Sequence, residues 1–300
     1  MENRTRGLRG LCRLLGYTPQ AYYRYEKGIS RRELQEELLI QQVLEHRKLQ
    51  PRIGARKLLV MLEPFMQAHG ISTGRDKFFE LLRNRSLLVR KKRYRVRTTF
   101  SMHRFKTYAD LAKGLLVERP GMLWVSDITY VRLSQGFAYL SLVTDAYSRK
   151  IIGFCVSHDL SSDSPLKALQ MAIKSNLPLN GPLIHHSDRG CQYCSGAYTG
   201  LLKKNGIAIS MTQDGNPRDN AIAERVNGIL KEELLGKNYR HLDALRPAVR
   251  SAVDVYNTLR PHASINMMTP EQAHHITGPI ERRWQNYYHS PLKKEVVMDG

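Results

Sequence analysis

The chain has 300 residues, of which 42% are hydrophobic and 8% aromatic, so it is long enough for two domains or one large domain with a sizeable core. Its 47 Lys and Arg residues exceed its 27 Asp and Glu residues, and the formal charge of +20 favours nucleic acid over an anionic membrane surface as the partner. No apolar run approaches the roughly 18 residues of a membrane span, no signal peptide is evident and the four cysteines form no disulfide framework, which together favour a soluble cytoplasmic protein.

The basic residues are concentrated in the first third of the chain. Residues 1–105 carry 24 Lys and Arg against 9 Asp and Glu, a net charge of +15, whereas residues 106–300 carry 23 against 18, a net charge of +5. The pattern predicts an N-terminal helical region at 1–48, which includes an amphipathic helix at 31–48. Two further helical patterns, at 52–65 and 75–88, predict a helix-turn-helix-like DNA-binding domain at 49–95.

Several cations of this front third are candidates for DNA contacts. The segment 91–106, KKRYRVRTTFSMHRFK, interleaves them with aromatic side chains. It is either a solvated linker or a segment that follows the DNA backbone while its aromatic rings stack on bases. We assign 96–118 as a basic linker. The candidate DNA-binding cations are Arg52, Arg56, Lys57, Arg75, Lys91, Lys92, Arg93 and Arg95.

From about residue 120 the pattern changes from helices to strands. The expected order is three strands in an antiparallel meander, followed by helices that alternate with two more strands, which predicts an α/β domain with a mixed five-stranded sheet at 119–240. A C-terminal helix and tail are expected at 241–300. The expected strands are 122–134, 136–148, 150–159, 182–188 and 206–212, and the expected helices are 161–176, a stretch that ends at Lys204, 219–234 and 243–259.

Three acidic residues of the predicted sheet domain are candidates for a catalytic site. Asp127 lies inside an apolar strand, where Asp is disfavoured, and Asp188 ends a short strand at a turn, where Asp is also common for structural reasons. Glu224 lies on the helix at 219–234, where it shares a stripe with Asn227 and Lys231 and could simply face solvent. Three carboxylates in a basic protein suit Mg²⁺, and two such ions would support displacement at phosphorus.

The segments around these residues resemble a known enzyme family. WVSDITYV, HHSDRGCQY and GNPRDNAIAERVNGILKEE are similar to the three motifs of the DDE transposases and retroviral-type integrases. Sixty residues separate Asp127 from Asp188, 35 separate Asp188 from Glu224, and Lys231 follows seven residues after the Glu. The resemblance is strongest to a bacterial insertion-sequence family whose transposase is commonly encoded in two overlapping frames, and it extends to 11–28 and 256–272.

The resemblance implies a ribonuclease-H-like core in which Asp127, Asp188 and Glu224 bind two Mg²⁺ ions, with Mn²⁺ as a substitute. The implied activity is nicking at the ends of the element and transfer of the freed 3′-OH to target DNA, through a circular intermediate. The expected partners are double-stranded DNA, at least one more copy of the chain, and a first-frame protein, with the complex associated with the nucleoid. Asn227 and Lys231 are better candidates for substrate DNA than for metal, because an ammonium group contacts phosphate and cannot ligate a cation.

Two other functions fit the same sequence. The chain could be a non-catalytic DNA-binding repressor, or a ribonuclease-H-like nuclease that cleaves without joining. Cys191 and Cys194 have the spacing of metal ligands, but no second Cys or His pair is placed to complete a zinc site.

Overall fold

The computed structural model describes residues 2–89, 106–176, 181–213, 220–236 and 239–281. The chain divides into two compact units, Met1–Lys91 and Lys92–Gly300. Each unit is described by itself. Within the described residues, no helix is both long enough and apolar enough to cross a lipid bilayer.

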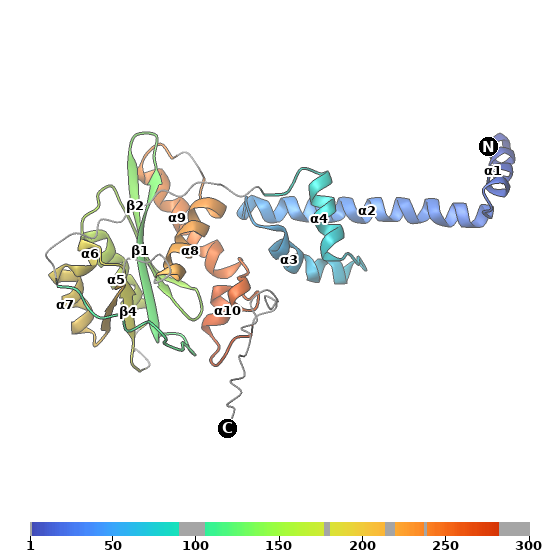
Figure 1. The fold of residues 1–300 in the computed structure, drawn as a ribbon. Helices are drawn as coiled ribbons and strands as arrows, with labels where there is room; N and C mark the ends of the chain where they lie inside the picture. Colours follow the sequence, from blue (N-terminus) through green and yellow to red (C-terminus); the bar gives the residue numbers. More distant parts are fainter. Residues whose placement is uncertain (1, 90–105, 177–180, 214–219, 237–238, 282–300) are drawn as a thin grey trace, which may run out of the picture. The chain divides into compact units, whose positions relative to one another are not determined.

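The first unit is entirely helical. Its core is formed where the second half of α2 packs against α3 and α4, around Val43, Leu58 and Phe78, which are all fully buried. The helix expected at 31–48 is therefore the second half of a longer helix. The four helices are α1 (Glu2–Leu14), α2 (Pro19–Leu49), α3 (Ala55–Ala68) and α4 (Arg75–Asn84) (Figure 1).

The second unit contains one five-stranded sheet with the order β3-β2-β1-β4-β5. The first three strands pair antiparallel, and β4 and β5 run parallel to β1. The predicted mixed five-stranded sheet of an α/β domain is confirmed. The strands are β1 (Leu123–Arg132), β2 (Phe137–Asp145), β3 (Ile151–Ser157), β4 (Ile184–Ser187) and β5 (Ala208–Met211).

Helices cover both faces of this sheet (Figure 1). On one face, α5 and α7 pack against Trp124 and Val143, and on the other face α8 and α9 pack against Leu140 and Leu142. The remaining elements are short. The bounds are α5 (Asp163–Ser175), α6 (Cys191–Cys194), α7 (Gly196–Lys204), α8 (Ala221–Ile229), the π-helix η1 (Leu230–Leu234), α9 (Leu242–Thr258), the 3₁₀-helix η2 (Ala263–Ile265) and α10 (Pro270–His274).

Two of the expected helices are each divided in the structure. The stretch that ends at Lys204 forms α6 and α7, because Ser195 adopts an extended conformation between them and its hydroxyl accepts a hydrogen bond from the Tyr198 N–H. The helix expected at 219–234 is α-helical only as far as Ile229 and continues as η1.

Candidate active site

Asp127 lies in the middle of β1 and points toward α8. Strand residues alternate between the two faces, so the neighbouring Ser126 points to the opposite side of the sheet. The Asn227 side-chain amide on α8 donates a hydrogen bond of 2.8 Å to Asp127 Oδ2, and the Ile128 N–H donates one of 2.9 Å to Oδ1. The carboxylate is thus held between its own strand and the covering helix.

Asp188 is placed beside Asp127 by the pairing of their strands. β4 runs parallel to β1 with Ser187, its last residue, opposite Ser126, so the residue that follows each of these serines is one of the two aspartates. The Gly190 N–H donates a 3.0 Å hydrogen bond to Asp188 Oδ1. A Cβ at residue 190 would lie only 3.0 Å from the same oxygen, which explains the glycine at this turn.

Glu224 enters from the first turn of α8, and its side chain is exposed. The start of this helix is fixed to β1, because the Asn220 side-chain amide donates a 2.9 Å hydrogen bond to the Ser126 carbonyl. Asn220 occupies the capping position of α8, but its side chain makes no capping hydrogen bond and reaches the strand instead.

The three carboxylates influence one another electrostatically. Burial raises the pKa of Asp127 to about 7, and the negative charges of Asp188 and, less strongly, Glu224 raise it as well. The hydrogen bonds from Asn227 and Ile128 act in the opposite direction. Within the described ranges, no three His, Cys, Asp or Glu side chains are already close enough together to hold one metal ion.

Asn227 differs from the sequence expectation. Its side chain is only 4% exposed and is directed at Asp127, so it supports the carboxylate from inside the protein and does not face DNA. The reason is that Asn227 lies on the side of α8 that packs over the sheet, where Ala223 and Val226 are buried as well. Lys231 is half-buried, and its Nζ lies 4.1 Å from the centroid of the Tyr130 ring, which is a cation–π contact.

The other predicted DNA-binding cations belong to the first unit or to the part of the chain that the structure does not describe. Four of them are on the first unit, with Arg56 and Arg75 exposed and Arg52 and Lys57 half-buried. Arg75 Nε also lies 2.9 Å from Asp76 Oδ1. The remaining four, Lys91, Lys92, Arg93 and Arg95, lie outside the described residues.

A buried polar network supports the strands beneath the carboxylates. His185 Nε2 lies 2.7 Å from Ser126 Oγ and 2.9 Å from Tyr198 Oη. Burial lowers the pKa of His185 to about 3, so its ring is neutral. The sequence places His185 near Asp188, but it carries no signal that Ser126 and Tyr198 would converge on it.

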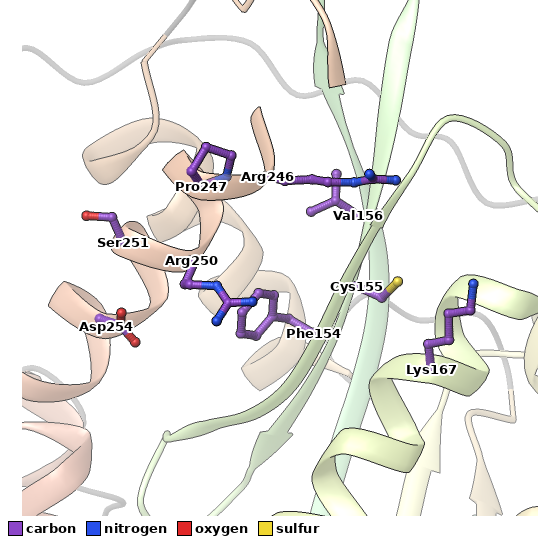
Figure 2. Close-up of a pocket in the computed structure, with 9 residues that line it drawn as sticks. All are labelled: Phe154, Cys155, Val156, Lys167, Arg246, Pro247, Arg250, Ser251 and Asp254. Carbon is purple, nitrogen blue, oxygen red and sulfur yellow. The ribbon is translucent and has the colours of Figure 1, made fainter. Parts of the chain in front are cut away.

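A separate cavity of about 620 Å³ lies at the outer edge of β3, between α5 and α9. Figure 2 shows Arg246 and Arg250 extending from α9 toward β3, with Lys167 on the opposite side. None of the predicted site residues lines this cavity.

Comparisons with known proteins agree on the second unit. Residues 117–217 match a family model described as an integrase core domain, and residues 205–270 match a second model with the same description. The chain is 30% identical over 265 residues to the "Insertion element IS600 uncharacterized 31 kDa protein" of Shigella sonnei, covering 87% of this chain and 96% of that protein. It is 34% identical over 252 residues to the "Putative transposase for insertion sequence element IS986/IS6110" of Mycobacterium tuberculosis (strain CDC 1551 / Oshkosh), covering 81% and 89%. Among solved structures, the HTLV-2 integrase catalytic core domain in complex with magnesium is 20% identical with a TM-score of 0.40, covering 52% of this chain and 98% of that one.

Proposed function

Because the chain belongs to the insertion-sequence transposases that carry an integrase core domain, we propose that it nicks DNA at the ends of its element and joins them to target DNA. In the first step, water attacks the phosphorus at an element end, and the bond from phosphorus to the 3′ oxygen breaks to leave a 3′-OH. In the second step, this 3′-OH attacks a target phosphodiester, and the target's own 3′ oxygen leaves.

The observation that supports the proposal most is the electrostatic influence of Asp188 and Glu224 on Asp127. Asp127 lies on β1, Asp188 directly follows the adjacent parallel strand β4 and Glu224 lies on α8, and the charges of the last two oppose ionisation of Asp127. An arrangement of three negative charges is stable only if a bound cation or a proton offsets their repulsion.

The residues fit a hard divalent cation. Carboxylate oxygens are the ligands that Mg²⁺ prefers, and the HTLV-2 integrase core was solved with magnesium. Asp127, Asp188 and Glu224 would hold the metal, which we propose is a pair of Mg²⁺ ions replaceable by Mn²⁺. When bound, the metal supplies Lewis-acid polarisation of the phosphate and activation of the attacking hydroxyl.

Other residues of the site position these groups. Asn227 holds Asp127 Oδ2 in a fixed orientation. Asn220 fixes the start of α8, the helix that carries Glu224, against β1. Lys231 is held over Tyr130 and offers a cation to the phosphate backbone of the bound DNA.

The test uses end-labelled duplexes taken from the DNA that flanks the coding sequence, incubated with Mg²⁺ or Mn²⁺. Asp127→Asn, Asp188→Asn and Glu224→Gln should each lower cleavage and joining by about 1,000-fold or more, because each removes a negative ligand of the metal. DNA binding should be retained. Asp163→Asn, which neutralises an exposed carboxylate at the start of α5, is the matched control and should leave activity unchanged. Full activity in all three site variants would refute the assignment.

The same assay separates the two competing functions. A DNA-binding repressor would bind the duplex without cutting it. A nuclease without joining activity would produce nicked DNA but no strand-transfer product. We favour the transposase because relatives named as insertion-sequence transposases match most of the chain.

We also propose that the active complex contains at least two copies of the chain, because joining requires two element ends to be brought together. A first-frame protein of the same element is a further candidate partner. Light scattering of the chain with and without end duplexes measures the first proposal, and a mass that stays at one chain per duplex would contradict it.

A further inference from the structure

The connection between α1 and α2 is a built turn. The Tyr17 N–H donates to the Cys12 carbonyl at 2.8 Å and the Gly16 N–H donates to the Arg13 carbonyl, which is the Schellman arrangement that ends a helix. Gly16 adopts the left-handed φ of 72° that this arrangement requires. Thr18 then caps α2, because its hydroxyl accepts a 3.1 Å hydrogen bond from the Ala21 N–H. Both helix ends are therefore fixed by local contacts.

This turn has the length of a helix-turn-helix. Helix-turn-helix motifs join their two helices through about 3–4 residues, often including Gly, and the second helix enters the major groove. Only residues 15–18 separate α1 from α2, whereas residues 69–74 separate α3 from α4. The first connection therefore fits the motif more closely than the one at which a helix-turn-helix was expected. In Figure 1, α1 turns away from the axis of α2.

The start of α2 has two different faces. At about 100° per residue, Gln20, Tyr23, Arg24 and Lys27 fall within one arc of roughly 100°. All four are exposed. A second set falls on the opposite side of the helix, in line with the residues that pack into the core of the first unit. That second set is Tyr22, Tyr25 and Ile29, which follow the stripe of Leu39, Ile40 and Val43 along the helix, although Tyr22 and Tyr25 are exposed as well.

The charge of this segment suits a polyanion. Residues 7–32 contain six Lys and Arg residues and one Glu. Arg and Gln are the side chains that form paired hydrogen bonds with guanine and adenine edges, and Lys contacts phosphate. Cys12 is 4% exposed and is the one buried side chain among the described residues of α1. A small side chain there allows the two helices to approach closely.

We propose that α1 and the first turns of α2 form a helix-turn-helix that reads the major groove of double-stranded DNA, with Gln20, Tyr23, Arg24 and Lys27 as its contact face. This face is distinct from the cations predicted at 49–95. The inference rests on the proposed function, because it names a surface by which a transposase holds the DNA of its own element.

The test is a selection for sequence preference, performed with the full chain in EDTA so that no cleavage is needed. A library of random 30-base-pair duplexes is bound and enriched, and affinities for an enriched duplex and a scrambled one are then measured by fluorescence anisotropy. Arg24→Ala should weaken binding to the enriched duplex by about 10- to 100-fold, with a smaller loss on the scrambled duplex. Gln20→Ala should relax the preference at one or two base positions.

Lys48→Ala is the matched control. It removes a cation from the other end of the same helix, where the side chain is exposed and paired with Glu45, so it should preserve the selected sequence. Circular dichroism and the thermal midpoint verify that each variant is folded. Equal losses for Arg24→Ala and Lys48→Ala, or no enriched sequence at all, would overturn the proposal.

Two further measurements separate the outcomes. If the Arg24 variant binds DNA normally but light scattering shows a smaller assembly, the face is a contact between copies of the chain and the proposal is wrong. The Asp127→Asn variant is put through the same DNA selection and should enrich the same sequence. If the unsubstituted chain selects this sequence but cleaves no DNA, the result contradicts the catalytic proposal alone.

Discussion

At the scale of single residues, one hydrogen bond defines the environment of the central carboxylate. The Asn227 amide donates to Asp127 Oδ2 and stabilises the ionised form against the burial and the negative neighbours that raise its pKa. The carbonyl oxygen of the same side chain is buried and has no hydrogen-bond partner among the described atoms. Among the described residues, the Asn227 side chain therefore makes one hydrogen bond, and that bond is with the candidate metal ligand.

Asn227→Ala should reduce DNA cleavage by about 10- to 100-fold, since hydrogen bonds to charged groups contribute about 1.5–3 kcal/mol. The affinity for DNA should stay the same, because the side chain is buried. Cleavage rates and anisotropy on the same duplex measure the two effects. Lys231→Ala is the comparison, and it should weaken DNA binding. If Asn227→Ala loses DNA affinity instead of rate, Asn227 contacts DNA and the positioning role is wrong.

His185 makes stability depend on pH. Its folded pKa is lowered to about 3, while an imidazole in the unfolded chain titrates near 6.5. Between these values the unfolded chain binds one more proton than the folded chain, so the free energy of unfolding falls as the pH falls below 6.5. The contribution is complete above that pH. The expected slope for one group is about 1.4 kcal/mol per pH unit.

Urea denaturation at pH 7.5, 6 and 5 measures this slope. His185→Gln has no titrating ring, so its loss of stability between pH 7.5 and 5 should be smaller than that of the unsubstituted chain. Equal losses in the two proteins would mean that His185 is protonated in the folded state.

At the scale of elements, the π-helix η1 depends on an ion pair with the segment that follows α9. Arg260 is 1% exposed, and its guanidinium lies 2.8 Å from Glu233 Oε2 on η1. The same guanidinium donates to His262 Nε2 at 2.9 Å. Because Lys231 lies on the same short helix, this pair also fixes the cation that we propose for the DNA backbone.

Arg260→Ala should destabilise the chain by about 3 kcal/mol, because it removes a buried guanidinium that is bound to both Glu233 and His262. Arg246→Ala is the matched control. Arg246 and Asp243 form an exposed pair at 3.6 Å, so its loss should be below about 1 kcal/mol. The midpoint of urea unfolding compares the two. Similar small losses would show that η1 is held by packing and not by the ion pair.

At the scale of the whole molecule, the basic charge is concentrated before residue 106, and residues 106–300 carry a smaller excess. The affinity of the full chain for DNA should therefore fall steeply with salt, by about 0.9 in log affinity per log salt for each phosphate contact. A chain of residues 106–300 should make at least about three fewer phosphate contacts, and its affinity should therefore fall less steeply with salt. Anisotropy titrations from 50 to 200 mM NaCl measure both, and equal slopes would place the DNA-binding charge within residues 106–300.

Much of the sheet domain was predictable because its signals are local. Apolar and β-branched runs marked the strands, and Asp127 stood out within one of them. The pairing of Ser126 with Ser187 and the direction of Asn227 were not predictable, because both depend on contacts between segments about 60 and 100 residues apart in the chain. The π-helix was missed for a similar reason, since its sequence reads as ordinary helix and its partner Arg260 is distant.

The first unit was less predictable. The helical signal at 31–48 was clear, but the earlier half of α2 contains an aromatic cluster at 22–25 and Gly28, which have low helix propensity. The start of α2 is set by the turn at Gly16 and the cap at Thr18, and not by the helix propensity of the residues that follow.

The 31 residues of α2 set a fixed spacing and angle between the turn at Gly16 and the helical core around Val43. A helix of this length spans about 46 Å, and each residue adds about 1.5 Å and 100° of rotation. A single inserted residue in its exposed middle would turn the N-terminal face by more than a quarter of a revolution while leaving every contact of that face intact. If DNA contacts both the start of α2 and the core at its other end, the rigid helix fixes the distance and the rotation between the two contacted stretches of the double helix.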